Sequence, residues 1–541
     1  MAQPGPRCWS VHLRLKNAPF LYTNGKGISR QAALASGLGE FVERLATGFF
    51  FENYFLEGMI NNSQYLHFPD EIWLPSFSRK DEQLLTKKLL NYYDPNGDLE
   101  EQHLLEQNTT DSGKGICCLP FINLEKKETV NFPVALLYNL YVSNGMAAGN
   151  SRNECFCQAL CEIIERHVKQ RVIAKGLTLP NIPTHFLERS PATKKILEKL
   201  KHHGYMVIVK DSSLGGCFPV ICVLLIHPES GSTFASFGAS LRFEVAIERT
   251  LTELLQGRKL AHLSHFQPPV YDLSLTADSY NIESHFINSD GLLPWQMLRD
   301  NAEYTFSPWD FSGTTAEELR QLKTLILSSG FSIYYREYNQ FGIDTCRIIV
   351  PGMSEIYPVD DLVWNNKNKT AVLRRLLLQL PQLNEGDLLF LLHQLDENTS
   401  DPHLLIPDLI GVLFEKDNPW NNLCVGELRA HILLALHNHQ HAAESCLWCL
   451  EYAPLSQQRK LLFRAILTLL ECRLAEEKYQ DYEKCHISFF PKEIYRQAKK
   501  MTAGKNRFSW LPFASTWREL SEKHNSLLTL YERFRETATT T

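Results

Sequence analysis

The chain lacks the features that would send it into a membrane or onto nucleic acid. Its N-terminus, MAQPGPRCWSVHLRLK, has no apolar stretch of about 7–15 residues such as a signal peptide needs, and apolar runs such as Val220–Ile226 are far too short to span a bilayer. With 55 Lys and Arg against 61 Asp and Glu, the net charge of −6 provides no basic surface for DNA or RNA. These absences predict a cytoplasmic protein that binds neither membrane nor nucleic acid.

A P-loop is also absent, and disulfides are not expected. No G-x-x-x-x-G-K-[ST] sequence occurs, and Gly25-Lys26-Gly27 is too short to replace one. The 14 cysteines include the adjacent Cys117 and Cys118, and a chain of 541 residues can bury a core without covalent links. We therefore expect reduced thiols, and any nucleotide site must be built in another way.

The distribution of glycine predicts two domains. Residues 1–370 hold 24 of the 28 glycines and alternate between helical and strand patterns, which predicts a mixed α/β (α+β) domain. The predicted helices include Gln31–Phe51, Ser151–Ala174 and Phe243–Gly257, and the predicted strands are Met206–Lys210, Val220–Ile226, Phe234–Ser236 and Cys346–Val350.

Residues 371–541 have a leucine-rich pattern with helical periodicity. The predicted helices are Ala371–Leu380, Asp387–Leu395, Glu427–His437, Gln457–Glu477 and Trp517–Arg535. Helix pairs of this kind stack in repeat proteins, although no clear repeat of about 34 residues is visible. We expect an all-α, helical-repeat-like C-terminal domain, similar to a TPR array, that serves interaction with a partner.

A first candidate motif combines Ser36, Glu40, Glu43 and Arg44 on one predicted helix. Glu40 and Glu43 are three residues apart and are therefore neighbours on one helical face, where like charges repel. Taken alone, this pattern is more typical of a solvated stripe on an amphipathic helix than of a binding site.

A second candidate follows the glycine-bearing loop 143–150, which leads into a helix whose free N–H groups suit a phosphate. The motif consists of Asn150, Glu154, Glu162, Glu165 and Arg166. At about 100° per residue, Glu154 and Glu165 differ by about 20° and Glu162 lies about 80° from Glu154, so the three carboxylates share a broad face. Glu154 also fits a capping box with Ser151, a role that does not extend to Glu162 and Glu165 because they lie past the first turn.

A third candidate is Arg249 with Glu253, one helical turn apart. An ordinary surface ion pair, worth only about 0.3–0.5 kcal/mol, explains this spacing by itself. If the three helices converge, however, five or six carboxylates would meet and would require cations. Carboxylate oxygens without clustered His or Cys suit Mg²⁺, and the arginines would then bind phosphate groups.

Together these motifs resemble the YcaO superfamily, whose ATP site is built from scattered S-x-x-x-E-x-x-E-R, glutamate-rich and R-x-x-x-E motifs. The resemblance implies ATP and Mg²⁺ as cofactors. It assigns Glu40, Glu43, Glu154, Glu162 and Glu165 to the metal ions, and Ser36, Arg44, Asn150, Arg166, Arg249 and Glu253 to the nucleotide. In the superfamily, ATP phosphorylates a peptide amide oxygen so that a nucleophile can attack the backbone carbonyl carbon, and ATP is hydrolysed overall.

Within the superfamily, the resemblance implies an accessory factor for β-methylthiolation of a small-subunit ribosomal protein. Its partner would be that ribosomal protein or its radical-SAM methylthiotransferase, and a homodimer is possible. A peptide-backbone cyclodehydratase and a catalytically weak scaffold are the alternatives. The chain opens near Trp9, without a preceding segment that carries nucleotide-binding Lys and Ser residues, and it ends without the proline-rich tail of azoline-forming members. We therefore expect weaker use of ATP and favour the accessory role over cyclodehydration.

Overall fold

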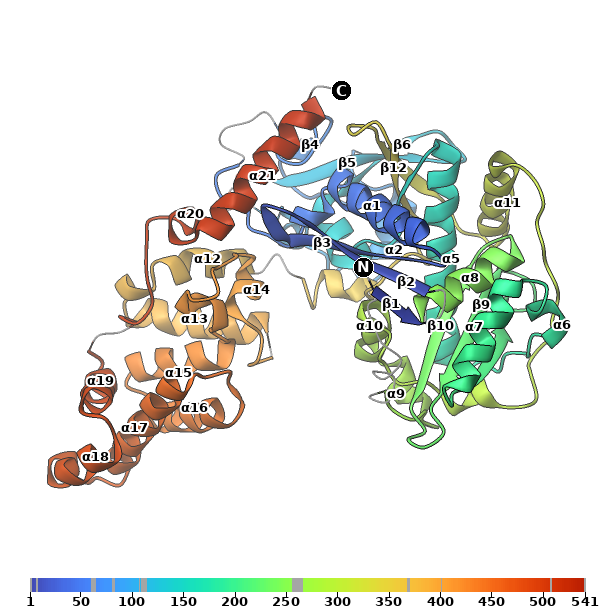
Figure 1. Cartoon of the computed structure of the whole chain (residues 1–541). Coiled ribbons are helices and arrows are strands. Elements are labelled where there is room, and N and C mark those ends of the chain that lie inside the picture. The colour runs from blue at the N-terminus through green and yellow to red at the C-terminus, as the bar shows by residue number, and fades with distance from the viewer. Residues whose placement is uncertain are drawn as a thin grey trace.

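The computed structural model describes residues 2–5, 8–59, 65–79, 83–106, 108, 114–254, 266–366, 370–399, 401–505 and 508–539. Figure 1 shows an N-terminal domain of sheets and helices beside a row of helices, and the last helix lies back against the N-terminal domain. The predicted order, a mixed domain followed by an all-helical region, is confirmed.

Three antiparallel sheets form the N-terminal domain. The first has the order β1 (Ala2–Gly5), β2 (Cys8–Leu15), β3 (Ala18–Gly27), and the second has the order β10 (Thr233–Ala239), β9 (Val220–Ile226), β8 (Met206–Asp211). The third has the order β4 (Ile72–Leu74), β5 (Ile116–Asn123), β11 (Tyr334–Tyr338), β12 (Asp344–Ile349), β7 (Met146–Gly149), and β6 (Thr129–Pro133) also pairs with β5. The four predicted strands correspond to β8, β9, β10 and β12, with ends that differ by at most three residues.

The helices that carry the three candidate motifs pack on these sheets (Figure 1). They are α1 (Arg30–Ala46), α5 (Arg152–Lys175) and α8 (Phe243–Glu253). Helix α1 contacts β2, β3 and β7, α5 contacts β7, β12 and β10, and α8 contacts β10 and β3. The other helices of this domain are α2 (Lys87–Tyr93), α3 (Glu101–Leu104), α4 (Val134–Leu136), α6 (Thr184–Leu187), α7 (Pro191–His202), α9 (Leu273–Ala277), α10 (Ser279–Ile287) and α11 (Thr315–Ser328).

Glycine allows α1 and α8 to approach their strands closely. A Cβ at Gly25 of β3 would collide with the carbonyl oxygen of Ala33 and the backbone of Gly37 in α1. A Cβ at Gly238 of β10 would lie 2.7 Å from the carbonyl oxygen of Ala246 in α8. Such contact of backbone on backbone requires residues without side chains, so these glycines fix where the two helices lie.

One predicted helix ends earlier in the structure than expected, and the predicted end of another lies outside the described residues. The first helix was expected to run to Phe51, but α1 ends at Ala46 because Gly48 adopts a φ of 74°, and residues 49–51 form a separate 3-10 turn. A left-handed glycine just after the last helical residues is a common helix terminator. The expected end of α8 at Gly257 lies outside the described residues.

The C-terminal region is helical throughout, as expected. Its helices are α12 (Ala371–Leu378), α13 (Glu385–Asn398), α14 (Ile406–Ile410), α15 (Val425–Ala435), α16 (His439–Tyr452), α17 (Gln457–Leu474), α18 (Glu483–Phe489), α19 (Lys492–Thr502), α20 (Trp517–Leu520) and α21 (Glu522–Thr539). The prediction of one continuous helix over Trp517–Arg535 is wrong in one respect, because Ser521 separates this segment into two helices, α20 and α21. The hydroxyl of Ser521 accepts a hydrogen bond from the backbone N–H of His524 (3.2 Å), which supports the start of α21.

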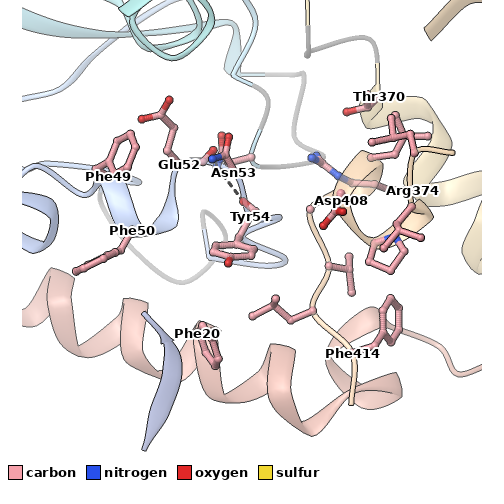
Figure 2. Close-up of a pocket in the computed structure, with 18 of the residues that line it drawn as sticks. Phe20, Phe49, Phe50, Glu52, Asn53, Tyr54, Thr370, Arg374, Asp408 and Phe414 are labelled. Atoms are coloured by element: carbon pink, nitrogen blue, oxygen red, sulfur yellow. Dashed lines mark hydrogen bonds between the residues drawn. The ribbon is translucent and has the colours of Figure 1, made fainter. Parts of the chain in front are cut away.

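The two domains enclose a cavity of about 1320 Å³ (Figure 2). Its N-terminal side is formed by β3 and by the segment after α1, and its C-terminal side by α12, by the chain from α14 to Phe414 and by Lys523 of α21. Glu40 and Arg44 of α1 also line it, so the cavity reaches the first candidate motif.

Helix α21 completes the core of the N-terminal domain although it lies at the end of the C-terminal region. Leu527, Leu528, Tyr531 and Phe534 are buried there, and the ring of Tyr531 lies 4.8 Å from the ring of Phe51. The N-terminal domain is therefore assembled from both ends of the chain, a feature that the predicted boundary at residue 370 does not include.

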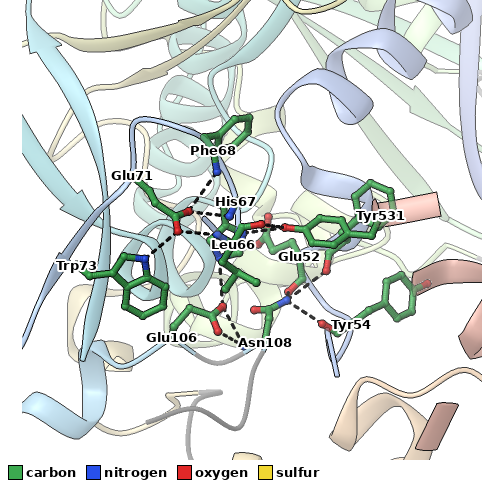
Figure 3. A network of polar contacts seen from close by, with 11 residues as sticks. Glu52, Tyr54, Leu66, His67, Phe68, Glu71, Trp73, Glu106, Asn108 and Tyr531 are labelled. Carbon is green, nitrogen blue, oxygen red and sulfur yellow. Dashed lines mark hydrogen bonds and ion pairs between the residues drawn. The ribbon is translucent and has the colours of Figure 1, made fainter. Parts of the chain in front are cut away.

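A buried polar network ties α21 to the loops of the N-terminal domain (Figure 3). The hydroxyl of Tyr531 donates to the carbonyl of Leu66 (2.9 Å) and lies 3.3 Å from Nδ1 of His67. The other ring nitrogen of His67 lies 3.3 Å from Oε1 of Glu106. Because these polar groups are buried, each contact compensates for lost hydration and fixes the position of the helix.

All 14 cysteines are free thiols, and most of them are buried. Within the described parts of the chain, no helix is both long and apolar enough to cross a membrane.

Acidification should destabilise the contact between α21 and the rest of the protein through His524. This side chain is buried, and the backbone N–H of Leu413 donates to its Nδ1 (3.4 Å). Burial, with a further contribution from the charge of Arg374, lowers the pKa of His524 to about 4. Since the unfolded side chain takes up its proton near pH 6.5, stability is lost as the pH falls from there toward 4, by about 2 kcal/mol at pH 5. Denaturant unfolding at pH 7 and pH 5 measures the free energy of unfolding that is lost on acidification. This loss should be smaller for His524→Gln than for the intact chain, whereas His393→Gln, at an exposed histidine, should lose as much as the intact chain does. Equal losses for all three proteins would show that His524 does not cause the effect.

Candidate functional site

Helix α1 brings two carboxylates and one guanidinium together on one face. Arg44 lies 3.1 Å from Glu43 and 3.6 Å from Glu40. Its guanidinium also stacks over the ring of Phe49 at 4.6 Å. Ser36 lies one turn before Glu40, where its hydroxyl accepts a hydrogen bond from the backbone N–H of Lys26 (3.4 Å). The first motif therefore forms one continuous face along β3.

Helix α5 contributes the second group of charges. Arg166 donates from Nε to Oε1 of Glu162 at 3.0 Å, and the same carboxylate oxygen lies 3.0 Å from its Nη2. The carboxylate of Glu165 accepts the backbone N–H of Ala239 (3.2 Å) at the end of β10. This bond fixes the middle of α5 against the second sheet.

Helix α8 joins the same place through Ala239 and through β3. Arg249 donates to the carbonyl of Ala239 (3.1 Å), so that Arg249 and Glu165 hold the two polar groups of one residue. Glu253, one turn later, forms an ion pair with Lys26 of β3. The structure thus brings charged side chains of three helices and one strand together; we call Lys26, Glu40, Glu43, Arg44, Glu162, Glu165, Arg166, Arg249 and Glu253 the charged cluster.

The carboxylates of the cluster influence one another across the helices. Burial raises the pKa of Glu43 to about 8; Arg44 opposes this shift, and Glu162 on α5 adds to it. Burial also raises the pKa of Glu40 and that of Glu165. The raised pKa values mean that ionisation of these three carboxyl groups costs free energy. A divalent cation bound beside them would favour the ionised forms, so the three groups are suited to bind one.

Lys26 is a member of the cluster that sequence reasoning missed. Burial lowers its pKa to about 8, the charge of Glu165 opposes this shift and the charge of Arg249 adds to it. In the sequence, Gly25-Lys26-Gly27 is too short to form a P-loop, and no role at the site was predicted for this lysine. The available signal was its position between two glycines of a strand that precedes a helix with a glutamate pair.

Asn150 and Glu154 lie outside the charged cluster, at the N-terminal end of α5. Glu154 is two helical turns before Glu162, or about 12 Å along the axis of α5. Its carboxylate accepts hydrogen bonds from the backbone N–H and the side-chain amide of Asn150, each at 3.2 Å. Ser151 caps the helix by accepting the N–H of Glu154 (3.3 Å), so one half of the predicted capping box forms and the carboxylate turns to Asn150 instead.

The cluster fits Mg²⁺ together with phosphates better than it fits a metal ion alone. Among the described residues, no group of three or more His, Cys, Asp or Glu side chains is arranged to hold a metal ion. Arg44, Arg166 and Lys26 instead stand beside the carboxylates as counter-ions. Mg²⁺ commonly takes one or two protein carboxylates and completes its shell with water and phosphate oxygens, and arginine and lysine are the usual partners of phosphate.

Comparison with known families covers nearly the whole chain. The family described as YcaO cyclodehydratase, ATP- and Mg²⁺-binding, matches residues 24–354, and the YcaO cyclodehydratase C-terminal domain matches residues 370–540. The cofactors expected from the sequence, ATP and Mg²⁺, are those of this family.

The chain is also similar to two curated relatives and to a solved structure. The chain is 40% identical over 537 residues to the ribosomal protein S12 methylthiotransferase accessory factor YcaO of Escherichia coli, an alignment that covers 98% of this chain and 92% of that protein. A Haemophilus influenzae protein is 37% identical over 544 residues, with the same shares covered. A YcaO structure from Methanopyrus kandleri, bound with AMPPCP and Mg²⁺, matches with a TM-score of 0.40 and 16% identity over 66% of this chain and 86% of that one.

Proposed function

This chain belongs to the YcaO family, and we propose that its charged cluster binds Mg-ATP. The observation that carries the proposal is the meeting of α1, α5, α8 and β3 in one group of paired acids and bases. In such a group the arginine and lysine side chains can exchange their carboxylate partners for phosphate oxygens. The carboxylates are then available to bind Mg²⁺.

In this proposal the acids and bases have separate tasks. The acids that would hold Mg²⁺ are Glu40, Glu43, Glu154, Glu162 and Glu165, and the side chains that would hold the nucleotide are Ser36, Arg44, Asn150, Arg166, Arg249 and Glu253, with Lys26 added. Mg-ATP would supply the phosphoryl group for activation of a peptide amide. The buried part of the cluster would exclude water and orient the phosphates.

We further propose that the protein acts in the cytoplasm as an accessory factor for methylthiolation of a small-subunit ribosomal protein. The high identity to the Escherichia coli factor over both domains supports this role. Mass spectrometry tests this role on the ribosomal protein from three kinds of cell: cells without this chain, cells that express the intact chain, and cells that express Glu162→Gln. Methylthiolation should be restored by the intact chain and not by Glu162→Gln. Full methylthiolation in cells without the chain would exclude the role.

A peptide-backbone cyclodehydratase is the second candidate, favoured by the description of the matching family. It would form a ring by loss of one water from a peptide that contains Cys, Ser or Thr. Incubation of such a peptide with the chain and Mg-ATP, followed by mass measurement, distinguishes the two: loss of water supports cyclodehydration, and an unchanged mass supports the accessory role.

Replacement of Lys26 by glutamine should weaken Mg-ATP binding by about tenfold or more, because a hydrogen bond to a charged group contributes about 1.5–3 kcal/mol. Glutamine retains much of the length of the side chain but removes its charge. Calorimetric titration measures the effect, and Lys175→Gln, at an exposed lysine in the last turn of α5, is the matched control. Equal affinity of the two variants would remove Lys26 from the site.

A further inference from the structure

The cavity between the two domains is larger than a small-molecule site. Its volume of about 1320 Å³ exceeds the range of about 300–1,000 Å³ that is usual for pockets of drug-sized ligands. Figure 2 shows side chains entering it from both domains: Phe20, Phe50 and Tyr54 from the N-terminal domain face Asp408 and Phe414 from the C-terminal domain. An occupant would therefore contact both domains at once.

The lining combines rings with amides. Aromatic side chains such as Phe50 and Tyr54 offer apolar surface, and eight of the lining residues are asparagines, among them Asn53 and Asn422. An asparagine amide both donates and accepts hydrogen bonds, as a peptide backbone does. This mixture suits an extended polypeptide, whose backbone needs polar partners and whose side chains need apolar ones.

The charged side chains that line the cavity favour a basic ligand over an acidic one. Among the described residues that line the cavity, five carry carboxyl groups and three carry cationic side chains, so their net charge is negative. Glu52 and Asp408 lie on opposite sides of it (Figure 2). A polyanion such as RNA would be repelled, whereas a segment that carries lysine or arginine would be attracted.

The N-terminal wall is held in place by the core. The side-chain amide of Asn108 donates to the carbonyls of Glu52 and Tyr54, each at 2.8 Å, and the backbone N–H of Asn108 donates to Glu106 of the buried network (Figure 3). Pre-organised walls lower the entropy that a ligand loses on binding. The segment that carries Glu52 and Tyr54 is thus a fixed surface.

We propose that this cavity binds an extended segment of a polypeptide substrate that carries a basic residue, and delivers one of its backbone amides to Glu40 and Arg44 at the edge of the charged cluster. The inference rests on the proposed Mg-ATP site, since Glu40 and Arg44 belong to both. It assigns the helical domain a direct part in substrate binding, because one wall of the cavity comes from α12, α14 and the chain around them.

Fluorescence anisotropy of a fluorescein-labelled, unstructured peptide of lysine, serine and leucine tests the proposal on the full chain. We expect binding that weakens by about tenfold in Asp408→Lys and in Tyr54→Ala, since each removes one attractive contact worth about 1.4 kcal/mol. Asp417→Lys, at an exposed acid outside the lining, makes the same charge change and should bind as the intact chain does. The same peptide with glutamate in place of lysine should bind at least about tenfold more weakly.

Two further measurements separate this inference from the proposed function. Mg-ATP titrations of Asp408→Lys and Tyr54→Ala should match the intact chain, because neither residue belongs to the charged cluster. If the intact chain binds the peptide in the predicted way but does not bind Mg-ATP, the proposed function fails and the peptide site remains. Equal peptide affinity of all variants, no peptide binding at all, or tighter binding of a labelled RNA oligonucleotide that Asp408→Lys strengthens would overturn the inference.

Discussion

Replacement of Glu162 by glutamine is expected to reduce Mg-dependent ATP turnover by about 100-fold, the order of effect seen when one pre-organised polar group is removed from an oxyanion hole. Glu162 lies at the centre of the charged cluster: it pairs with Arg166 on its own helix, and its charge contributes to the raised pKa values of Glu40 and Glu43 on α1. Glutamine preserves the size of the side chain and removes the negative charge that a metal ion requires. Phosphate release by the purified chain, with and without Mg²⁺, measures the loss.

Glu244→Gln is the control for this experiment. Glu244 is an exposed glutamate in the first turn of α8, a helix that also carries Arg249 and Glu253. The control should retain normal turnover, because its carboxylate lies outside the cluster. Comparable turnover by both variants would show that Glu162 holds no metal ion, and turnover that is independent of Mg²⁺ would contradict the assignment of the acids.

Truncation of one side chain in the last helix should destabilise the N-terminal domain. Tyr531→Ala removes a fully buried ring that packs on Phe51 and breaks the hydrogen bond to Leu66. Large-to-small substitutions of buried aromatic residues cost about 3–5 kcal/mol, and the loss of buried polar partners adds to this. Denaturant unfolding, followed by tryptophan fluorescence, should show the change in the free energy of unfolding.

Arg533→Ala provides the comparison on the same helix, since Arg533 is exposed. A surface substitution of this kind changes stability by less than about 0.5 kcal/mol. Mg-ATP binding should also weaken in Tyr531→Ala at temperatures where the domain begins to unfold, whereas Arg533→Ala should bind normally. If the two variants are equally stable, α21 contributes nothing to the core of the N-terminal domain.

Periodicity predicted the helices of the site but not everything that meets there. The spacing placed Glu40 and Glu43 on one face of α1, and Glu162 and Glu165 on one face of α5, since residues three apart lie on one helical face. The assignment of both pairs to one site came from the family resemblance. Lys26 was missed because it lies on a strand, and its position between two glycines does not by itself show whether its side chain faces the cluster or solvent. The proximity of strand and helix comes from Gly25 and Gly37, whose importance depends on tertiary contact.

The sequence also did not predict that the C-terminal helix packs on the N-terminal domain. An amphipathic pattern shows which face of a helix is apolar, but it does not show which surface that face covers. Tyr531 and Phe534 were therefore assigned to the helical domain with the rest of the segment, although they pack on Phe51 in the N-terminal domain. The family resemblance, by contrast, was carried by the motifs themselves, and the 40% identity over 98% of the chain confirms it.

Calorimetric titration of ATP into the intact chain and into Glu40→Ala, with and without Mg²⁺, tests whether the charged cluster is a Mg-ATP site. We expect a single saturable binding event for the intact chain that requires Mg²⁺ and is lost in Glu40→Ala. Absence of binding to the intact chain, or binding that neither the metal nor Glu40 affects, would contradict the assignment of the charged cluster as a Mg-ATP site.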